Sequence, residues 1–151
     1  MKSHKDLPLS ELTLRRYEKP FKLSGRALIK KLCLSIGLLQ PGDSRDVVVD
    51  VFSVILNNKG LNSREIEEKV ILSRKNQKLA LLGIASSNIR RQLKRLKDIQ
   101  LIERVGNSYR LNEDLTLPEI FEEKIESIHL KSVKNRVKEY FEAVHKEIKK
   151  D

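Results

Sequence analysis

Apolar residues recur every three or four positions through most of the chain, which is the spacing of helices that bury one face. A first helix is predicted from Ser24, which can act as its N-cap. Residues 40–43, with Pro41 and Gly42 at their centre, break this pattern and form the best internal boundary. The apolar positions of a second helix follow at the same spacing: Val47, Val48, Val51, Phe52, Ile55 and Leu56.

The second helix carries a mixed signal. Its β-branched residues favour a strand, but its period favours a buried helix and extends over about three turns, so we predict a helix. Ser44 can cap this helix, and the carboxylates of Asp43, Asp46 and Asp50 favour its N-terminal end through the helix dipole. Gly60 lies just beyond its end.

Two further helices are predicted in the middle of the chain. Asn62 lies three residues before Glu65, which is the spacing of a capping box, and so begins the first of them. A basic connector over residues 74–84 then leads to a helix over residues 86–99.

The helix over residues 86–99 has a well-defined N-terminus and a narrow apolar side. Ser86 or Ser87 can serve as its N-cap. Ile89, Leu93 and Leu96 fall on one side at 100° per residue and are expected to face the core.

The period changes from helical to alternating after residue 100, which predicts a β-hairpin. Residues 101–105 and 108–111 form its strands, and Gly106-Asn107 is a two-residue turn of the kind that hairpins favour. We therefore expect a short hairpin over residues 102–111.

A long helix closes the chain. Thr116 and Pro118 are start signals for it. The step from Ile128 to Val133 breaks the spacing of its apolar residues, which predicts a kink or a second helix near His129.

The order of these elements predicts a mainly α fold with a small β-hairpin, and more specifically a winged helix-turn-helix domain. The domain covers residues 43–117, with the hairpin as its wing. A basic N-terminal arm and helix occupies residues 1–42, and a C-terminal helical dimerisation segment occupies residues 118–151.

Charge is distributed unevenly over these three parts. The 151-residue chain has 31 Lys and Arg against 21 Asp and Glu, a formal net charge of +10. Residues 1–42 contribute +6, residues 43–117 contribute +4 and residues 118–151 are neutral. A basic excess of this size favours a polyanionic partner such as nucleic acid.

Composition excludes several other classes of protein. A single cysteine rules out an intramolecular disulfide framework and a cysteine-based zinc site. No apolar stretch has the length of a membrane span, and we see no nucleophile, general-base pair or glycine-rich phosphate loop. We therefore expect a soluble, cytoplasmic protein that is not an enzyme and has no metal and no cofactor.

The polar side of the helix over residues 86–99 is suited to the major groove of DNA. Arginine can contact guanine there and asparagine can contact adenine, while hydroxyl groups at a helix N-terminus suit phosphate oxygens. Arg104 lies beside the hairpin turn, within reach of the minor groove or a phosphate. The predicted DNA-binding residues are Ser86, Ser87, Asn88, Arg90, Arg91, Lys94, Arg95, Lys97, Arg104 and Asn107.

Residues 85–97 followed by residues 101–111 resemble the recognition helix and wing of prokaryotic winged-helix transcription regulators of the MarR and ArsR type, archaeal ones in particular. The resemblance covers residues 44–112 and implies binding of double-stranded DNA and regulation of transcription. Family members often have Gly where Gln100 stands, and the connector over residues 74–84 is long. The metal-binding Cys and His sets of metal-sensing relatives are missing, so metal sensing is not implied.

The apolar residues of the C-terminal segment predict a homodimer. A neutral helix of this length has little globular core left to cover, so pairing with a second chain is favoured over packing on its own domain. The predicted dimerisation residues are Phe121, Ile125, Val133, Val137, Phe141, Val144 and Ile148.

Three alternatives remain open at this point. The basic side of the helix over residues 86–99 could be merely solvated, or the winged helix could bind protein within a transcription or chromosome-maintenance complex. Binding of RNA is disfavoured because aromatic residues make up only 5% of the chain.

Arg15, Arg16 and Tyr17 could form a DNA-contacting arm, although a packing or dimer-contact segment is favoured. Cys33 is expected in the core, and Tyr109 is expected to pack the hairpin onto the helices.

Overall fold

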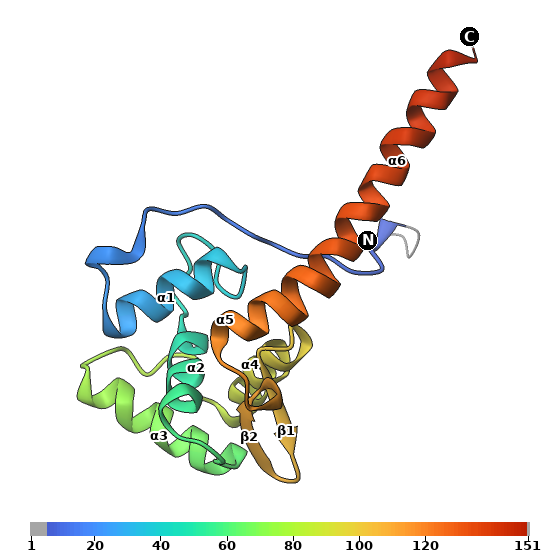
Figure 1. Cartoon of the computed structure of the whole chain (residues 1–151). Helices are drawn as coiled ribbons and strands as arrows, with labels where there is room; N and C mark the ends of the chain where they lie inside the picture. Colours follow the sequence, from blue (N-terminus) through green and yellow to red (C-terminus); the bar gives the residue numbers. More distant parts are fainter. Residues whose placement is uncertain (1–5, 151) are drawn as a thin grey trace.

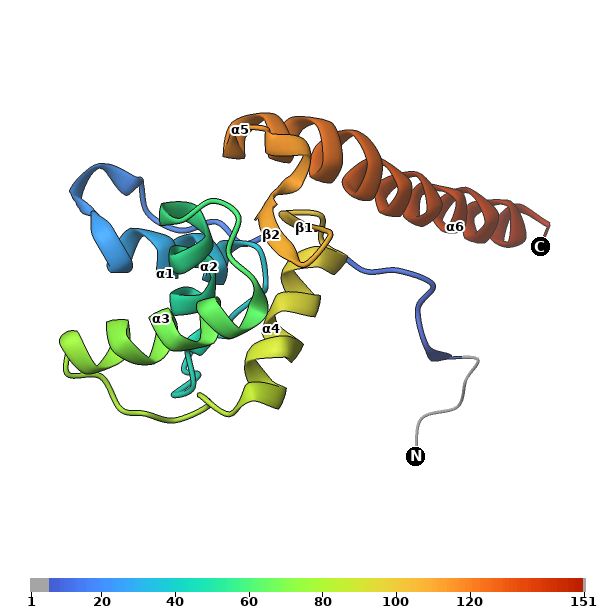
Figure 2. The same cartoon turned by 90° about the horizontal axis from the view of Figure 1, so that it is seen from below.

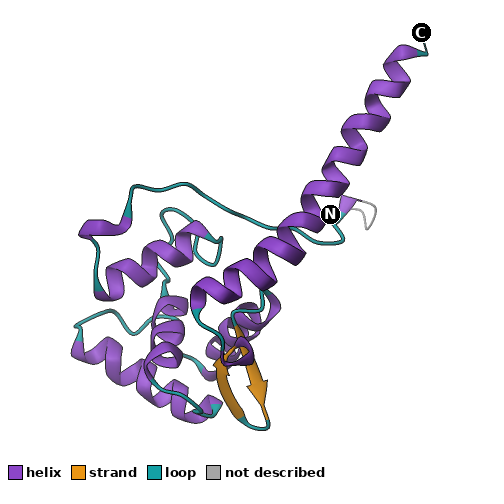
Figure 3. Ribbon diagram, in the orientation of Figure 1, coloured by secondary structure: helices purple, strands orange, loops and turns teal. Residues whose placement is uncertain are grey.

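A computed structural model describes residues 6–150; residues 1–5, where the predicted N-terminal arm begins, and residue 151 lie outside the described part. Helices account for 61% of these described residues, which also include one antiparallel hairpin (Figures 1 and 3). The elements in chain order are η2 (Pro20–Lys22), α1 (Gly25–Ser35), α2 (Val47–Asn57), α3 (Ser63–Asn76), α4 (Ser86–Asp98), β1 (Ile102–Val105), β2 (Ser108–Leu111), η3 (Asn112–Asp114), α5 (Leu117–Ile120), η4 (Phe121–Leu130) and α6 (Lys131–Lys149).

Helix α2 lies at the centre of the helical body, where it contacts α1, α3, α4 and β2 (Figures 1 and 2). Eight of its eleven residues are buried, Phe52 completely. A helix covered from several directions is apolar nearly all round, and this explains why its sequence also had the character of a strand. The prediction of a helix here is confirmed.

Four charged residues, of which Asp46, Asp50 and Arg74 are buried and Arg26 is half-buried, join α1, α2 and α3, and we call them the ion cluster. Arg74 Nη1 lies 3.1 Å from Asp46 Oδ1 and 2.5 Å from Asp50 Oδ2. Arg26 pairs with both carboxylates as well, at 3.0 Å from Asp50 Oδ1 and 3.1 Å from Asp46 Oδ2. Burial raises the pKa of Asp46, but the hydrogen bonds and charges of Arg26 and Arg74 outweigh it and hold this pKa below its ordinary value.

The ion cluster corrects two expectations. Arg74 is not part of the connector, because α3 continues to Asn76 and turns this guanidinium into the core. Ser44 does not cap α2: Asp46 is the N-cap residue, and its side chain makes no capping hydrogen bond. The carboxylates of Asp46 and Asp50 bind the arginines of neighbouring helices rather than serving only the helix dipole.

Local signals placed the starts of several other helices correctly. Asn62 and Glu65 form the capping box at the start of α3, and Thr116 forms one with Glu119 at the start of α5. Ser24 is the N-cap residue of α1, although its side chain makes no capping hydrogen bond.

Helix α4 ends in a Schellman motif at Gln100. The backbone N–H of Gln100 donates to the Lys97 carbonyl at 2.9 Å, and the N–H of Leu101 donates to the Leu96 carbonyl at 3.1 Å. Gln100 has a φ of 63°, the left-handed conformation that glycine adopts most easily. Its side-chain Oε1 is buried and has no hydrogen-bond partner among residues 6–150. The departure from glycine noted in the sequence therefore lies at a position where glycine has a physical advantage.

The hairpin forms over the predicted residues. Ile102 pairs with Leu111 and Val105 with Ser108, which leaves Gly106-Asn107 as the turn. An isolated antiparallel bridge between Leu61 and Tyr109 attaches the hairpin to the segment before α3. Tyr109 is only 9% exposed, so the expectation that it packs the hairpin onto the helices is confirmed.

The C-terminal helix runs from α5 through η4 into α6 and projects away from the helical body (Figures 1 and 2). The helix changes type close to the predicted position at His129: the π-helical η4 ends at Leu130 and the α-helical α6 begins at Lys131, with right-handed helical backbone across the junction. In the π-helical segment η4, hydrogen bonds run from i to i+5 and each turn takes up more residues than an α turn. The five-residue step from Ile128 to Val133 is accommodated in this way. None of the helices in residues 6–150 has the length and apolar character needed to cross a membrane.

Replacing Arg74 by Met should destabilise the protein strongly, because Asp46 and Asp50 lose a buried partner. We expect a loss of about 3 kcal/mol in the free energy of unfolding, the lower end of the range for a broken buried pair, since Arg26 remains in place. Urea unfolding measures this loss. Arg64→Met on the same helix is the matched control, because Arg64 is 88% exposed and its pair with Glu68 is worth less than about 0.5 kcal/mol. Equal losses for the two variants would contradict the structural role of the ion cluster.

Replacing Gln100 by Gly should stabilise the protein by about 1 kcal/mol, because it relieves the strain of a left-handed backbone conformation and removes a buried, unpaired oxygen. Thermal unfolding followed by circular dichroism measures the change. The same replacement three residues earlier, Lys97→Gly, lies inside α4 and should cost about 1 kcal/mol. A destabilised Gln100→Gly variant would show that the side chain has a role that outweighs its strain.

Candidate nucleic-acid interface

Helix α4 presents one apolar side to the core and an opposite, exposed side to solvent. Ile89, Leu93 and Leu96 are at most 1% exposed, which confirms the predicted stripe. Gln92 is also buried, at 6% exposed, so the covered side is wider than the sequence indicated. The exposed positions on the helix are Ser87, Arg90, Arg91, Lys94, Lys97 and Asp98.

The N-terminus of α4 differs from the prediction. Ala85 occupies the N-cap position, and neither Ser86 nor Ser87 caps the helix. The hydroxyl of Ser86 instead donates to Glu67 Oε1 of α3 at 2.5 Å. This bond uses the hydroxyl hydrogen of Ser86 that we expected to meet a phosphate, whereas Ser87 is exposed.

One flank of α4 faces α3 and the hairpin, and it gathers three arginines around a shallow groove. The groove has a volume of about 320 Å³. Arg104 is held at its rim by hydrogen bonds from Nε to the Gly106 carbonyl at 2.9 Å and from Nη2 to Asn107 Oδ1 at 3.1 Å. The lining residues are Asn62, Ser63, Arg64, Arg90, Arg104, Asn107 and Tyr109.

This groove adds residues that the sequence analysis missed. Arg64 and the N-terminus of α3 were not among the predicted contacts, because they precede the helix over residues 86–99 by more than twenty positions. The capping box at Asn62 was the sequence signal for this part of the groove, because it determines where α3 begins. Among residues 6–150, neither Arg90 nor Arg104 forms an ion pair with a carboxylate.

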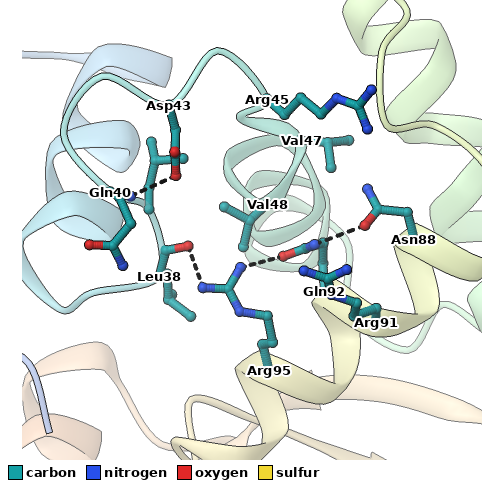
Figure 4. A pocket seen from close by; sticks show the side chains of 11 residues that line it. Leu38, Gln40, Asp43, Arg45, Val47, Val48, Asn88, Arg91, Gln92 and Arg95 are labelled. Atoms are coloured by element: carbon teal, nitrogen blue, oxygen red, sulfur yellow. Dashed lines mark hydrogen bonds between the residues drawn. The ribbon is translucent and has the colours of Figure 1, made fainter. Parts of the chain in front are cut away.

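The opposite flank of α4 faces the loop between α1 and α2, and its polar side chains are engaged within the protein (Figure 4). Arg95 is half-buried and donates to Gln92 Oε1 and to the Leu38 carbonyl, both at 2.7 Å. Asn88 donates to the Gly83 carbonyl at 2.7 Å and accepts a bond from Gln92. The expectation that Arg95 lies on the outward side is therefore wrong, and the Asn88 amide uses one N–H and its oxygen within the protein.

The remaining cations of α4 are in solvent. Lys94 pairs with Asp98 at 2.9 Å, but both side chains are more than half exposed, so the pair is weak. Lys97 is exposed and has no carboxylate partner in the described part of the chain. The outer side and the hairpin flank of α4 together form a cationic surface, defined here by Arg64, Arg90, Arg91, Lys94, Lys97 and Arg104.

The predicted dimerisation residues divide into two groups. Ile125 is 2% exposed within a single chain, so the expectation that it is reserved for a second chain is wrong. Phe121 is 39% exposed and Val133 is half-buried. The four residues that follow on α6 are 49% to 74% exposed, and we call them the α6 stripe: Val137, Phe141, Val144 and Ile148.

The only cysteine has the environment of a core residue. Cys33 is fully buried, and burial raises the pKa of its thiol to about 12, so it stays protonated at neutral pH. Residues 6–150 contain no group of three or more His, Cys, Asp or Glu side chains placed to hold a metal ion.

Comparison of the chain with models of protein families, with curated proteins and with solved structures yields no match. We therefore infer the function from the cationic surface and from the arrangement of the helices and hairpin around it.

Proposed function

We propose that this protein binds double-stranded DNA through α4 and regulates transcription. The observation that carries this proposal is the cationic surface on the exposed side of α4 and the neighbouring hairpin. Six basic side chains from α3, α4 and β1 gather there, and only Arg64 and Lys94 have carboxylate partners among residues 6–150. Such a surface is the electrostatic footprint of a partner with regularly spaced phosphates.

The arrangement of the elements supports a winged helix-turn-helix interpretation. α2, α3 and α4 are followed by a hairpin, and the bridge between Leu61 and Tyr109 attaches that hairpin to the start of α3. In this interpretation α4 is the recognition helix and the hairpin is the wing, as the resemblance to MarR- and ArsR-type regulators implies. An α-helix fits the major groove of B-DNA, which is about 12 Å wide.

The side chains of the cationic surface have different expected partners. Ser87, Arg91 and Lys94 point away from the core and would face base edges in the major groove of the DNA. Arg90 and Arg104 line the groove of the protein beside the N-terminus of α3 and would contact DNA phosphates on one side of the major groove. The wing turn is only two residues long, so backbone contact is expected there rather than base recognition.

The first test of this proposal removes the two flanking arginines together. Arg90→Ala combined with Arg104→Ala should weaken binding to all duplex sequences alike and lower the slope of log K against log salt by about 2, one per phosphate contact. Arg91→Ala should instead cost about 1–3 kcal/mol at a selected site. Fluorescence anisotropy with random and selected duplexes at several salt concentrations measures both effects.

Arg136→Ala is the matched control, because this exposed arginine lies on α6 and pairs with Glu139. It should leave the affinity and its salt slope unchanged. If the double variant binds duplex DNA as well as the unchanged protein does, the DNA proposal is wrong. A protein-binding module is then favoured. Leu81 and Leu82 beside α4 are 43% and 49% exposed and would be available to contact a protein partner.

We propose further that α6 pairs two copies of the chain. The α6 stripe has helical spacing, yet α6 contains no buried residue and projects from the body into solvent (Figures 1 and 2). Burying each of these side chains against a partner is worth about 1.5–3 kcal/mol, which can offset the entropy lost on association. A dimer would hold two copies of α4 for successive major grooves about 34–36 Å apart, and its site should be an inverted repeat.

Replacing Val137 by Asp should make the protein monomeric, because a charge within the stripe would have to be buried in the dimer. Asn135→Asp adds the same charge on the other side of α6 and should leave the dimer intact. Sedimentation equilibrium of both variants and of the unchanged chain measures the effect. A monomer for the unchanged chain at high micromolar concentration, or a dimer for Val137→Asp, would show that α6 does not pair two chains.

A further inference from the structure

A polar cavity lies on the flank of α4 away from the hairpin. It has a volume of about 430 Å³, within the range of small-molecule sites. Its walls come from the loop between α1 and α2, the first turn of α2 and the flank of α4 that carries Asn88, Gln92 and Arg95 (Figure 4). The DNA proposal uses only one of its side chains, Arg91.

The cavity has an excess of positive charge. Three guanidinium groups, of Arg45, Arg91 and Arg95, are on its lining, and none of them forms an ion pair with a carboxylate within residues 6–150. The one acidic residue on the lining, Asp43, accepts a hydrogen bond from the backbone N–H of Gln40 at 2.9 Å. The lining therefore has a formal charge of +2.

Part of this charge is held in place before any ligand arrives. Arg95 is fixed by its bonds to the Leu38 carbonyl and to Gln92, and Gln92 is fixed in turn by Asn88 (Figure 4). These bonds use two of the five N–H donors of the Arg95 guanidinium. A cation with spare donors and little freedom left to lose is suited to binding an oxyanion, because less ordering is needed on binding.

From this geometry we propose that the cavity binds the phosphate group of a ligand. Guanidinium forks match phosphate oxygens, and the cavity is lined by Arg45 from the loop between α1 and α2 and by Arg91 and Arg95 from α4. The phosphate belongs either to a free small molecule or to the DNA backbone on the side of α4 opposite the hairpin. Because Arg91 is also part of the cationic surface, a free ligand in the cavity would compete with DNA, and this competition rests on the proposed function.

Titration calorimetry of the full chain with pyrophosphate, without DNA and at low salt, tests the site directly. We expect one pyrophosphate per chain, with affinity reduced about tenfold or more by Arg45→Gln and by Arg91→Gln, because each removes a charge-assisted contact. Arg136→Gln removes the same charge from α6 and should leave the affinity unchanged. Circular dichroism establishes that each variant is folded.

A second arm measures duplex DNA binding with and without pyrophosphate. Pyrophosphate that binds and lowers duplex affinity identifies a free ligand. A chain that ignores pyrophosphate, but whose salt slope for duplex binding falls in Arg45→Gln, identifies the DNA backbone as the source of the phosphate. The proposal is overturned if neither effect is seen, or if Arg136→Gln reduces the affinity as much as Arg45→Gln does. Because the titration contains no DNA, its failure is distinct from failure of the DNA proposal.

Discussion

The buried ion cluster is the interaction on which the rest of the structure depends. α2 is covered by α1, α3, α4 and β2, so Asp50 lies in the interior with 2% exposure and must be neutralised there. Arg26 of α1 and Arg74 of α3 do this from two directions, and each helix is thereby fixed to α2. Breaking such a pair costs more than the pair contributes in isolation, because the remaining charge stays buried. The cluster therefore restricts how the three helices can be placed relative to one another.

The same packing decides which cations of α4 are available to a partner. The loop after α1 brings the Leu38 carbonyl against α4, and Arg95 is held by it. On the other flank, the start of α3 and the hairpin turn leave Arg90 and Arg104 in an open groove. One helix therefore has a flank whose polar groups bind within the protein and a flank whose charges face solvent. Both proposals, for DNA and for a phosphate-bearing ligand, follow from this division.

The C-terminal helix shows where a hydrophobic pattern has two possible meanings. Ile120 and Ile125 are buried against the chain's own body, and the apolar residues from Val137 onward are exposed. The apolar residues have the same helical spacing in both parts. This spacing indicates that one side of the helix is apolar, but it does not indicate what covers that side. The π-helical segment η4, which contains Ile125, takes up the five-residue step at Ile128 and continues into α6 without a break.

The sequence by itself determined the features that depend on neighbouring residues: the capping box at Asn62, the helix start at Thr116, the Gly106-Asn107 turn and the apolar side of α4. Each involves groups only a few positions apart, so local spacing is sufficient to predict it. Only the tertiary structure decided the partners of Arg74, Ser86 and Arg95, which lie 24, 19 and 57 residues away along the chain. Each of these polar side chains had several possible partners in the sequence. The folded chain brings one of those partners within hydrogen-bond distance, and this contact cannot be read from local spacing.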